Sequence, residues 1–329
     1  MATAVIISNM GGPDSLETVE PYLYNIFKDP DIIDIPLPER WREKFVRWLA
    51  KKRGPESREI YEKIGGKTPL TRITEKQATG LQDLLNAEDI DHFDVFPAMR
   101  YWHPFIEDVW TDVVSRKYDR IVILTLYPFY STTTTGSLEQ LIKRLNADGT
   151  VADQNLLMIS RFGSHPTFIQ AMAEQINRAI NKNRQYFDGR NVELMFSAHS
   201  IPMRRIRKGD PYQDEVEEAV NLLKPHLPDN VNIHLCYQSK LGPIKWLEPQ
   251  TDQTIDALAE KGIKHLMVYP LGFVADNSET VYEIGMLYKE QALSNGMEWF
   301  YRIPSLNIEK RFIQALAEKV IEAYKQKFL

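Results

Sequence analysis

Residues 120–128 read RIVILTLYP, an almost continuous run of apolar side chains that ends at a proline. A strand that is covered on both faces has such a run, because neither face shows polar side chains to water. Seven further runs of this kind follow the chain, at 4–9, 93–99, 156–162, 192–199, 231–238, 265–274 and 297–304. These eight runs predict strands of parallel sheets, which helices cover on both faces.

The segments between the runs show helical periodicity. Apolar residues recur at helical spacing in two of them: Ile169, Met172, Ile176 and Ile180 in one, and Phe312, Leu316, Val320 and Tyr324 in the other. Thr74 and Gln77 have the spacing of a capping box, which predicts a helix start near Thr74. Alternating strands and helices predict an α/β fold of two Rossmann-like doubly wound domains, each with a four-stranded parallel sheet. We expect domains at 1–160 and 161–307, with a final helix at 308–329 that joins the first domain.

Composition excludes several classes of protein. The 329 residues are 43% hydrophobic and 26% charged with a net charge of -5, which is typical of a globular protein and not of a nucleic-acid binder. Cys236 is the one cysteine, so neither an iron–sulfur cluster held by four thiolates nor an internal disulfide can form. The N-terminus lacks the basic start of a signal peptide. The longest uncharged stretch, residues 121–138, is interrupted by Pro128 and Gly136, so we do not expect it to span a membrane. We therefore expect a cytoplasmic protein.

Ligands of open parallel sheets bind beyond the carboxyl ends of the strands. His199 stands at such an end, where an imidazole could exchange protons near neutral pH. Asp276, Glu279 and Glu283 follow another strand, and the two glutamates have the spacing that puts them on one face of a helix. The alternatives are a structural histidine and a solvated acidic helix start, which the helix dipole favours.

Two other segments allow more than one interpretation. The segment 9–15, NMGGPDS, lacks both phosphate-loop patterns, so we expect no nucleotide and interpret Gly11 and Gly12 as room for a flat ligand. The segment 35–53, IPLPERWREKFVRWLAKKR, has an apolar stripe among basic residues: Trp41, Phe45, Trp48 and Leu49. This stripe could be a lip that touches a membrane, or it could pack on the core of the protein.

Eight segments together resemble the ferrochelatase family, in the order and over nearly the whole length that this family shows. They are NMGGPDS at 9–15, YEKIGGKTPL at 61–70, MRYWHPFIEDV at 99–109, LYPFYSTTTTGS at 126–137, FSAHSIP at 196–202, KGDPY at 208–212, YQSKLGPIKWLEPQTD at 237–252 and GFVADNSETVYEI at 272–284. The resemblance implies a lyase of haem biosynthesis, with a class II chelatase fold and a porphyrin cleft between its two domains.

The resemblance also implies site residues. His199 and Glu279 would be catalytic and would face each other near the centre of the macrocycle, with Glu283 and Asp276 behind Glu279 as further metal ligands on a helix with a widened turn. Porphyrin contacts would come from Met10, Arg53, Tyr61, Thr68, Arg100, Tyr127 and Trp246, with Arg53 and Thr68 near the propionates. This sequence departs from the family at Asn277, where a histidine is usual, and at Phe129, where a polar residue is frequent.

The expected reaction is the insertion of Fe²⁺, as a substrate, into protoporphyrin IX. A base must remove two pyrrole protons while the pocket bends the ring. His199 could accept the protons while Glu279 guides the metal, or the roles could be reversed, and we favour the first assignment. Met10 favours protoporphyrin, because relatives that act on coproporphyrin tend to have tyrosine there. The alternatives are a coproporphyrin III ferrochelatase, a chelatase that inserts cobalt or nickel into another tetrapyrrole, a non-catalytic haem carrier and a two-lobed sugar-binding or nucleotide-binding protein. We expect a monomer or homodimer, with peripheral contact to the inner membrane through 35–53.

Overall fold

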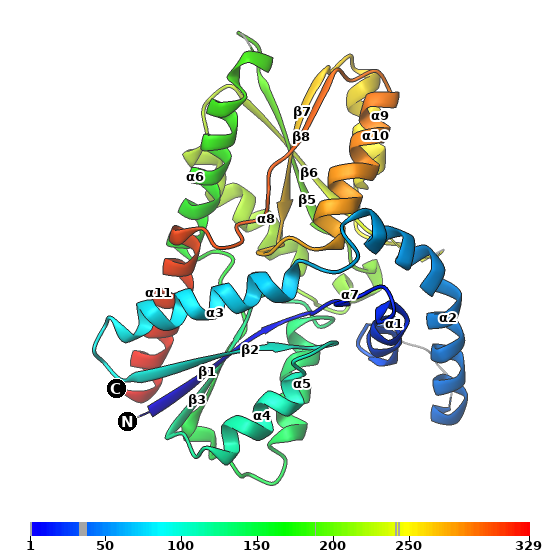
Figure 1. Ribbon diagram of the computed structural model, residues 1–329. Coiled ribbons are helices and arrows are strands. Elements are labelled where there is room, and N and C mark those ends of the chain that lie inside the picture. Colours follow the sequence, from blue (N-terminus) through cyan, green and yellow to red (C-terminus); the bar gives the residue numbers. More distant parts are fainter. Residues whose placement is uncertain (1, 33–37, 188, 241, 243) are drawn as a thin grey trace. The chain divides into compact units, whose positions relative to one another are not determined.

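The computed structural model describes residues 2–32, 38–187, 189–240, 242 and 244–329. The chain forms two compact units, one made of Met1–Arg161 and Leu316–Leu329 and the other of Phe162–Ala315. Each unit contains one four-stranded sheet in which every pair of neighbouring strands is parallel (Figure 1). The predicted α/β fold with two parallel sheets is confirmed.

The sheet of the first unit has the strand order β2-β1-β3-β4. Its strands are β1 (Ala2–Asn9), β2 (His92–Met99), β3 (Arg120–Thr125) and β4 (Leu156–Ile159). Helices α4 (Ile106–Ser115) and α5 (Thr135–Leu145) pack on one face through a buried cluster that includes Ile6, Trp110, Ile123 and Leu141. On the other face lie α3 (Leu70–Asn86) and α11 (Lys310–Phe328) (Figure 1). Tyr324 of α11 packs edge to face on Phe93.

The sheet of the second unit has the order β6-β5-β7-β8. Its strands are β5 (Val192–His199), β6 (Val231–Gln238), β7 (His265–Leu271) and β8 (Trp299–Arg302). One face is covered by α9 (Thr251–Glu260), a π-helix (Glu279–Tyr288) and α10 (Lys289–Ser294), and the other by α6 (Pro166–Lys182) and α8 (Tyr212–Leu223) (Figure 1). The short helix α7 (Met203–Ile206) follows β5. The widened turn expected at Glu279–Glu283 is thus confirmed as a π-helix.

All eight predicted strands occur, but several end earlier than the apolar runs do. The run 120–128 gives a strand that stops at Thr125, and Leu126 and Phe129 continue as buried loop residues. The capping-box prediction was wrong, because α3 already starts at Leu70 and the Thr74 hydroxyl donates to the Leu70 carbonyl within the helix. Cys236 is buried in β6 as expected, and its burial raises the pKa of the thiol to about 12.

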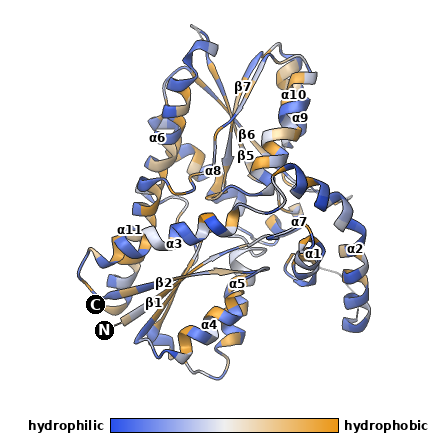
Figure 2. Cartoon of the chain, viewed as in Figure 1, coloured by the Kyte–Doolittle hydropathy of each residue, from blue (hydrophilic) through white to orange (hydrophobic). Residues whose placement is uncertain are grey.

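Helix α1 (Val19–Lys28) packs against the long helix α2 (Glu39–Lys63). The buried face of α2 carries Val46, Ala50 and Tyr61, whereas Trp41, Phe45 and Trp48 are 51%, 37% and 53% exposed. The interpretation of the aromatic stripe as a core-packing face is therefore wrong. Residues 35–37 of the predicted lip lie outside the described residues. In Figure 2 most of α2 is hydrophilic, with a few hydrophobic residues along it. Within the described ranges, no helix has the length and apolar character that crossing a bilayer requires.

Candidate active site

His199 and the π-helix lie at the same edge of the second sheet, beyond the carboxyl ends of its strands. His199 closes β5 in register with Gln238 at the end of β6, and Ala198 pairs with Leu271 at the end of β7. The Gln238 amide nitrogen lies 3.4 Å from the backbone carbonyl oxygen of Glu279. Gln238 thus contacts both the strand that ends in His199 and the helix that begins at Glu279.

The His199 ring is oriented by a hydrogen bond to the backbone. Its Nδ1 lies 2.7 Å from the carbonyl oxygen of Ser200, which can only accept a hydrogen bond. In the neutral imidazole the proton is therefore on Nδ1, and Nε2 carries the lone pair. A lone pair on Nε2 can accept a proton or bind a metal ion. Burial raises the pKa of Tyr212, whose neutral phenol forms a hydrogen bond with the backbone of His199.

Glu283 is held by four donors from three residues. Its Oε1 accepts from the Tyr288 hydroxyl at 2.7 Å and from the Ser239 backbone N–H at 3.1 Å. Its Oε2 accepts from the Gln238 amide at 3.0 Å and from the Ser239 hydroxyl. Burial, and then the nearby Glu283 carboxylate, raise the pKa of Tyr288, so this tyrosine stays a donor. These four donors are all neutral groups.

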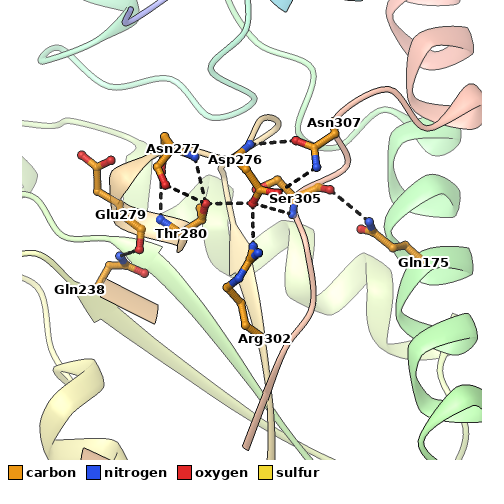
Figure 3. Close-up of polar contacts among 9 residues, drawn as sticks. All are labelled: Gln175, Gln238, Asp276, Asn277, Glu279, Thr280, Arg302, Ser305 and Asn307. Carbon is orange, nitrogen blue, oxygen red and sulfur yellow. Dashed lines mark hydrogen bonds and ion pairs between the residues drawn. The ribbon is translucent and has the colours of Figure 1, made fainter. Parts of the chain in front are cut away.

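Asp276 also accepts four hydrogen bonds, but one of its partners is a cation. Its Oδ1 lies 2.7 Å from Arg302 Nη1, 2.9 Å from the Thr280 hydroxyl and 3.3 Å from the Ser305 backbone nitrogen. Its Oδ2 accepts from the Asn307 amide at 3.0 Å. Figure 3 shows the Asp276 carboxylate directed toward Arg302 and Asn307, whereas the Glu279 carboxylate points away from this group.

Asn277, where the family usually has histidine, caps the helix that carries Glu279. The Asn277 side-chain oxygen accepts from the Thr280 backbone N–H at 2.9 Å, and the Thr280 hydroxyl accepts from the Asn277 backbone N–H at 3.0 Å (Figure 3). These reciprocal bonds satisfy two backbone donors at the helix start, as a capping box does. Asn277 therefore has a structural role that its neutral amide performs well.

The predicted metal ligands do not form a ready-made metal site. Among the residues that the structure describes, no three His, Cys, Asp or Glu side chains converge as the ligands of one ion. Within the described part of the chain, the Glu279 carboxylate makes few hydrogen bonds: its Oε2 accepts one from the Ser278 hydroxyl at 2.9 Å. The role of these residues as iron ligands stays a prediction.

In the first unit, three predicted porphyrin residues gather at the carboxyl ends of β1, β2 and β3. Met10 follows β1 and packs on a buried aromatic cluster that includes Tyr101 and Trp102. Arg100 follows β2, and its backbone N–H donates to the Asn9 carbonyl at 2.8 Å. Tyr127 follows β3 and is half-buried.

The remaining predicted porphyrin residues have different surroundings. Tyr61 is buried between α1 and α2, and Arg53 forms an exposed ion pair with Glu56 on α2. Thr68 lies so close to Gly12 that a Cβ at Gly12 would be 2.7 Å from the Thr68 Cβ, so that glycine makes room for protein rather than for a flat ligand. In the second unit, Trp246 pairs with Pro202, in the segment that follows His199.

Arg100 is part of a buried cluster that the sequence did not indicate. Asp29, whose side chain is 3% exposed, accepts from Arg100 at 2.8 Å, from the Tyr101 hydroxyl at 2.8 Å and from the Ser137 hydroxyl at 2.6 Å. The Arg100 side chain is itself 12% exposed. This cluster joins the end of α1, the end of β2 and the start of α5.

Removing the Arg100 guanidinium should destabilise the protein strongly. Arg100→Ala leaves the Asp29 charge buried without its cation, which costs about 3–5 kcal/mol of the free energy of unfolding. Urea denaturation followed by circular dichroism measures the loss. Arg116→Ala, which breaks an exposed pair with Asp112, is the matched control and should cost at most about 1 kcal/mol. Equal losses in the two variants would contradict the argument.

Sequence reasoning missed several of these partners. Gln238 and Ser239 end a predicted strand, so the rule about strand ends could have pointed to them. Arg302 ends β8, but the predicted strand 297–304 extended past it, so the rule did not point to it. Tyr288 and Asp29 carry no such signal, because each one reaches its partner only through the tertiary fold.

Comparison with known proteins shows the family of the chain. The family model described as Ferrochelatase matches residues 2–324. A ferrochelatase from Aquifex aeolicus is 41% identical over 324 residues, which cover 97% of this chain and 99% of that protein. A ferrochelatase from Geotalea uraniireducens is 42% identical over 318 residues, with 97% of both chains covered. One from a Picosynechococcus strain is 38% identical over 325 residues, or 98% of this chain and 83% of that one.

Solved structures share the fold at much lower sequence identity. SirB from Bacillus subtilis, solved with Fe³⁺, has a TM-score of 0.56 at 11% identity, covering 100% of this chain and 98% of its own. CbiX, described as the terminal enzyme of sirohaem biosynthesis in denitrifying bacteria, has a TM-score of 0.55 at 14% identity, covering 98% and 99%. At these identities the likeness shows that the chain shares the fold of these two proteins. From its sequence over nearly its full length, the chain belongs to the ferrochelatase family, whose members insert a metal ion into a porphyrin.

Proposed function

We propose that this ferrochelatase inserts Fe²⁺ into protoporphyrin IX to form haem b, with His199 as proton acceptor and Glu279 as guide for the metal. The reaction replaces two pyrrole N–H protons by one Fe²⁺, so two protons leave and charge is conserved. The observation that carries the proposal is the 2.7 Å contact between His199 Nδ1 and the Ser200 carbonyl, because it leaves the Nε2 lone pair available to those protons.

Glu279 and Glu283 suit the delivery of the cation. The four donors to Glu283 described above are neutral groups rather than a cation, and within the described part of the chain Glu279 has a carboxylate with few bonds to protein. A carboxylate and an imidazole bind Fe²⁺ without the strong hold of a thiolate cage, so the metal can pass on to the porphyrin nitrogens. Ring bending would draw on contacts at the edges of the macrocycle, for which Met10, Tyr127 and Trp246 are candidates.

Two observations favour protoporphyrin, which has two propionates, over coproporphyrin, which has four. Both arginines predicted at the porphyrin already have partners: Arg100 pairs with buried Asp29, and Arg53 pairs with Glu56. Met10 packs among aromatic side chains and supplies an apolar wall. A substrate with four carboxylates would require more unpaired cations than these two positions offer.

An anaerobic assay of Fe²⁺ with each porphyrin tests the choice of substrate. We expect kcat/KM for protoporphyrin to exceed that for coproporphyrin III by at least about tenfold, the equivalent of about 1.4 kcal/mol in the transition state. Absorbance changes in the Soret region follow the insertion, and Met10→Tyr should narrow the difference. A preference for coproporphyrin III would assign the chain to the alternative branch, and tight haem binding with no turnover would make it a carrier.

We also propose that the protein binds the inner membrane peripherally through α2. Three exposed aromatic residues, Trp41, Phe45 and Trp48, lie at helical spacing on one face of the helix. Cations flank them: Arg40 and Lys44 lie 5.6 and 5.4 Å from the Trp41 ring. Exposed aromatics with basic neighbours suit the headgroup region of an anionic bilayer.

Sedimentation with lipid vesicles tests this contact. Vesicles that contain anionic lipid should bind the protein at low salt, and binding should weaken at high salt, because screening reduces the attraction of the basic residues. Trp41→Ser combined with Trp48→Ser should abolish binding. Leu84→Ser, at an exposed leucine on α3 of the same unit, should have no effect on binding. Binding that survives the double substitution would exclude α2 as the contact.

A further inference from the structure

We infer that Asp276 is a positioning residue that acts with Arg302 to fix the start of the π-helix, and that it binds neither iron nor protons during the reaction. This inference rests on the proposed catalytic role of Glu279. It concerns Asp276 and the residues around it in Figure 3, which come from the end of β8, the segment after it and the helix start: Arg302, Ser305, Asn307, Asn277 and Thr280.

The first argument is that protein donors already occupy the Asp276 carboxylate. Each carboxylate oxygen offers about two lone-pair positions, and Asp276 accepts three hydrogen bonds on Oδ1 and one on Oδ2, so Oδ1 is saturated and Oδ2 keeps one position. Arg302 also balances its charge in an ion pair whose two side chains are only 20% and 13% exposed. A cation at Oδ1 would have to displace these donors, and a cation at either oxygen would meet the positive charge of Arg302.

The second argument is that the network ends on the residues that flank Glu279. Thr280 is fully buried, and its hydroxyl donates to Asp276 and accepts from the Asn277 backbone N–H. The Asn277 side chain in turn accepts from the Thr280 backbone N–H. These bonds join Asn277, which precedes Glu279 in the chain, to Thr280, which follows it. The network therefore determines the direction in which the Glu279 side chain leaves the helix.

The third argument is independent of hydrogen bonds and concerns Gly285, in the middle of the π-helix. A Cβ placed at Gly285 would lie 3.3 Å from Arg302 Nε and 3.4 Å from its Cδ. The Arg302 side chain therefore runs directly across the helix at a position that has no side chain of its own. Arg302 thus packs on the helix that it also fixes through Asp276.

The two roles for Asp276 predict different kinetics. A metal ligand would change the KM for Fe²⁺ when it is replaced, and its partner Arg302 would be dispensable. A positioning network would lower kcat by about 10- to 100-fold when any of its members is removed, since loss of a supporting contact has effects of this size. The KM values for Fe²⁺ and porphyrin would then change little, because the binding groups remain.

The decisive experiment compares Asp276→Asn, Arg302→Gln and the double variant in the anaerobic assay. We expect kcat to fall by about 10- to 100-fold in both single variants. The double variant should be no slower than the less active of the two single variants, because the residues act as one unit. The inference is overturned if Arg302→Gln has wild-type kinetics, if Asp276→Asn chiefly raises the KM for Fe²⁺, or if the two losses multiply.

A conservative pair keeps the test informative if Arg302→Gln does not fold. Thr280→Val removes the hydroxyl at nearly constant volume and should lower kcat as Arg302→Gln does, whereas Thr280→Ser should restore the rate. Arg311→Gln, which breaks the more exposed pair with Glu174 in the same unit, is the matched control and should leave kcat unchanged. Equal rates in the valine and serine variants would refute the inference.

Glu279→Gln distinguishes failure of this inference from failure of the proposed function. If Glu279→Gln keeps its rate, the catalytic role of Glu279 is wrong whatever the network does. If Glu279→Gln is inactive while Thr280→Val and Arg302→Gln are fully active, the proposed function stands and the positioning role alone is excluded.

Discussion

Substitution of His199 by alanine is expected to lower kcat for iron insertion by about 100- to 10,000-fold, the range that a positioned general base contributes. The lone pair on Nε2, oriented by the bond from Nδ1 to the Ser200 carbonyl, is the group that would receive the pyrrole protons. Porphyrin binding should change little, since one partly buried ring is a small part of the contact with a large macrocycle. Absorbance measures turnover, and quenching of tryptophan fluorescence measures porphyrin affinity.

His199→Asn sharpens this test, because it separates support of the loop from proton transfer. An asparagine amide can donate to the Ser200 carbonyl as Nδ1 does, yet it has no basic nitrogen. The asparagine variant should therefore be as inactive as the alanine variant. His226→Ala, at an exposed histidine of the same unit, is the control and should keep its full rate. An alanine variant at position 199 that retained most of its activity would remove His199 from the chemistry.

Glu279→Gln is expected to have the second large effect, a loss of turnover by about 100-fold or more with nearly unchanged porphyrin affinity. Glutamine keeps the size of the side chain and can still accept the Ser278 hydrogen bond, but it lacks the negative charge that attracts Fe²⁺. Because the porphyrin ring would still bind and bend, kcat should fall while the KM for porphyrin should stay nearly unchanged. Steady-state kinetics at saturating porphyrin measure this separation.

Glu290→Gln is the matched control for that experiment, since Glu290 lies exposed on the neighbouring helix α10. It should have wild-type kinetics at every iron concentration. A rate for Glu279→Gln close to that of the control would mean that the metal reaches the ring without this carboxylate.

The order of strands and helices could be read from the sequence because each element carries its own signal. The run 192–199 is mostly apolar, with Glu193 and Ser197 as interruptions before His199, as is typical of a strand between two helical layers, and it became β5 with the same bounds. Strand ends were less certain, since the loop residues Leu126 and Phe129 are as buried as the strand before them. Apolar character reports burial, and it does not distinguish a buried strand from a buried loop.

The aromatic stripe of α2 shows the converse problem. Periodicity indicates that Trp41, Phe45 and Trp48 share one face, but it does not say which face the core covers. Smaller residues, Val46 and Ala50, make the buried face because they allow α1 to approach closely. The larger aromatic residues were thus assigned correctly to one face, and only the structure showed that this face is exposed.

Within the site, residues at strand ends were predictable and their partners were not. His199 follows from the rule that ligands bind beyond the carboxyl ends of parallel strands. Arg302 lies on the last strand and meets Asp276 only because β7 and β8 are neighbours in the sheet. Resemblance to a family suggested a role for Asp276, but four specific contacts were needed to question it.

The position of Cys236 has a practical consequence for experiments on this enzyme. The side chain is fully buried in β6, and a thiol whose pKa is raised to about 12 holds almost no thiolate at neutral pH. Maleimide dyes and thiol-reactive spin labels would therefore not react with Cys236 in the folded protein. A cysteine introduced at any exposed position could then be labelled alone, without first removing the natural one.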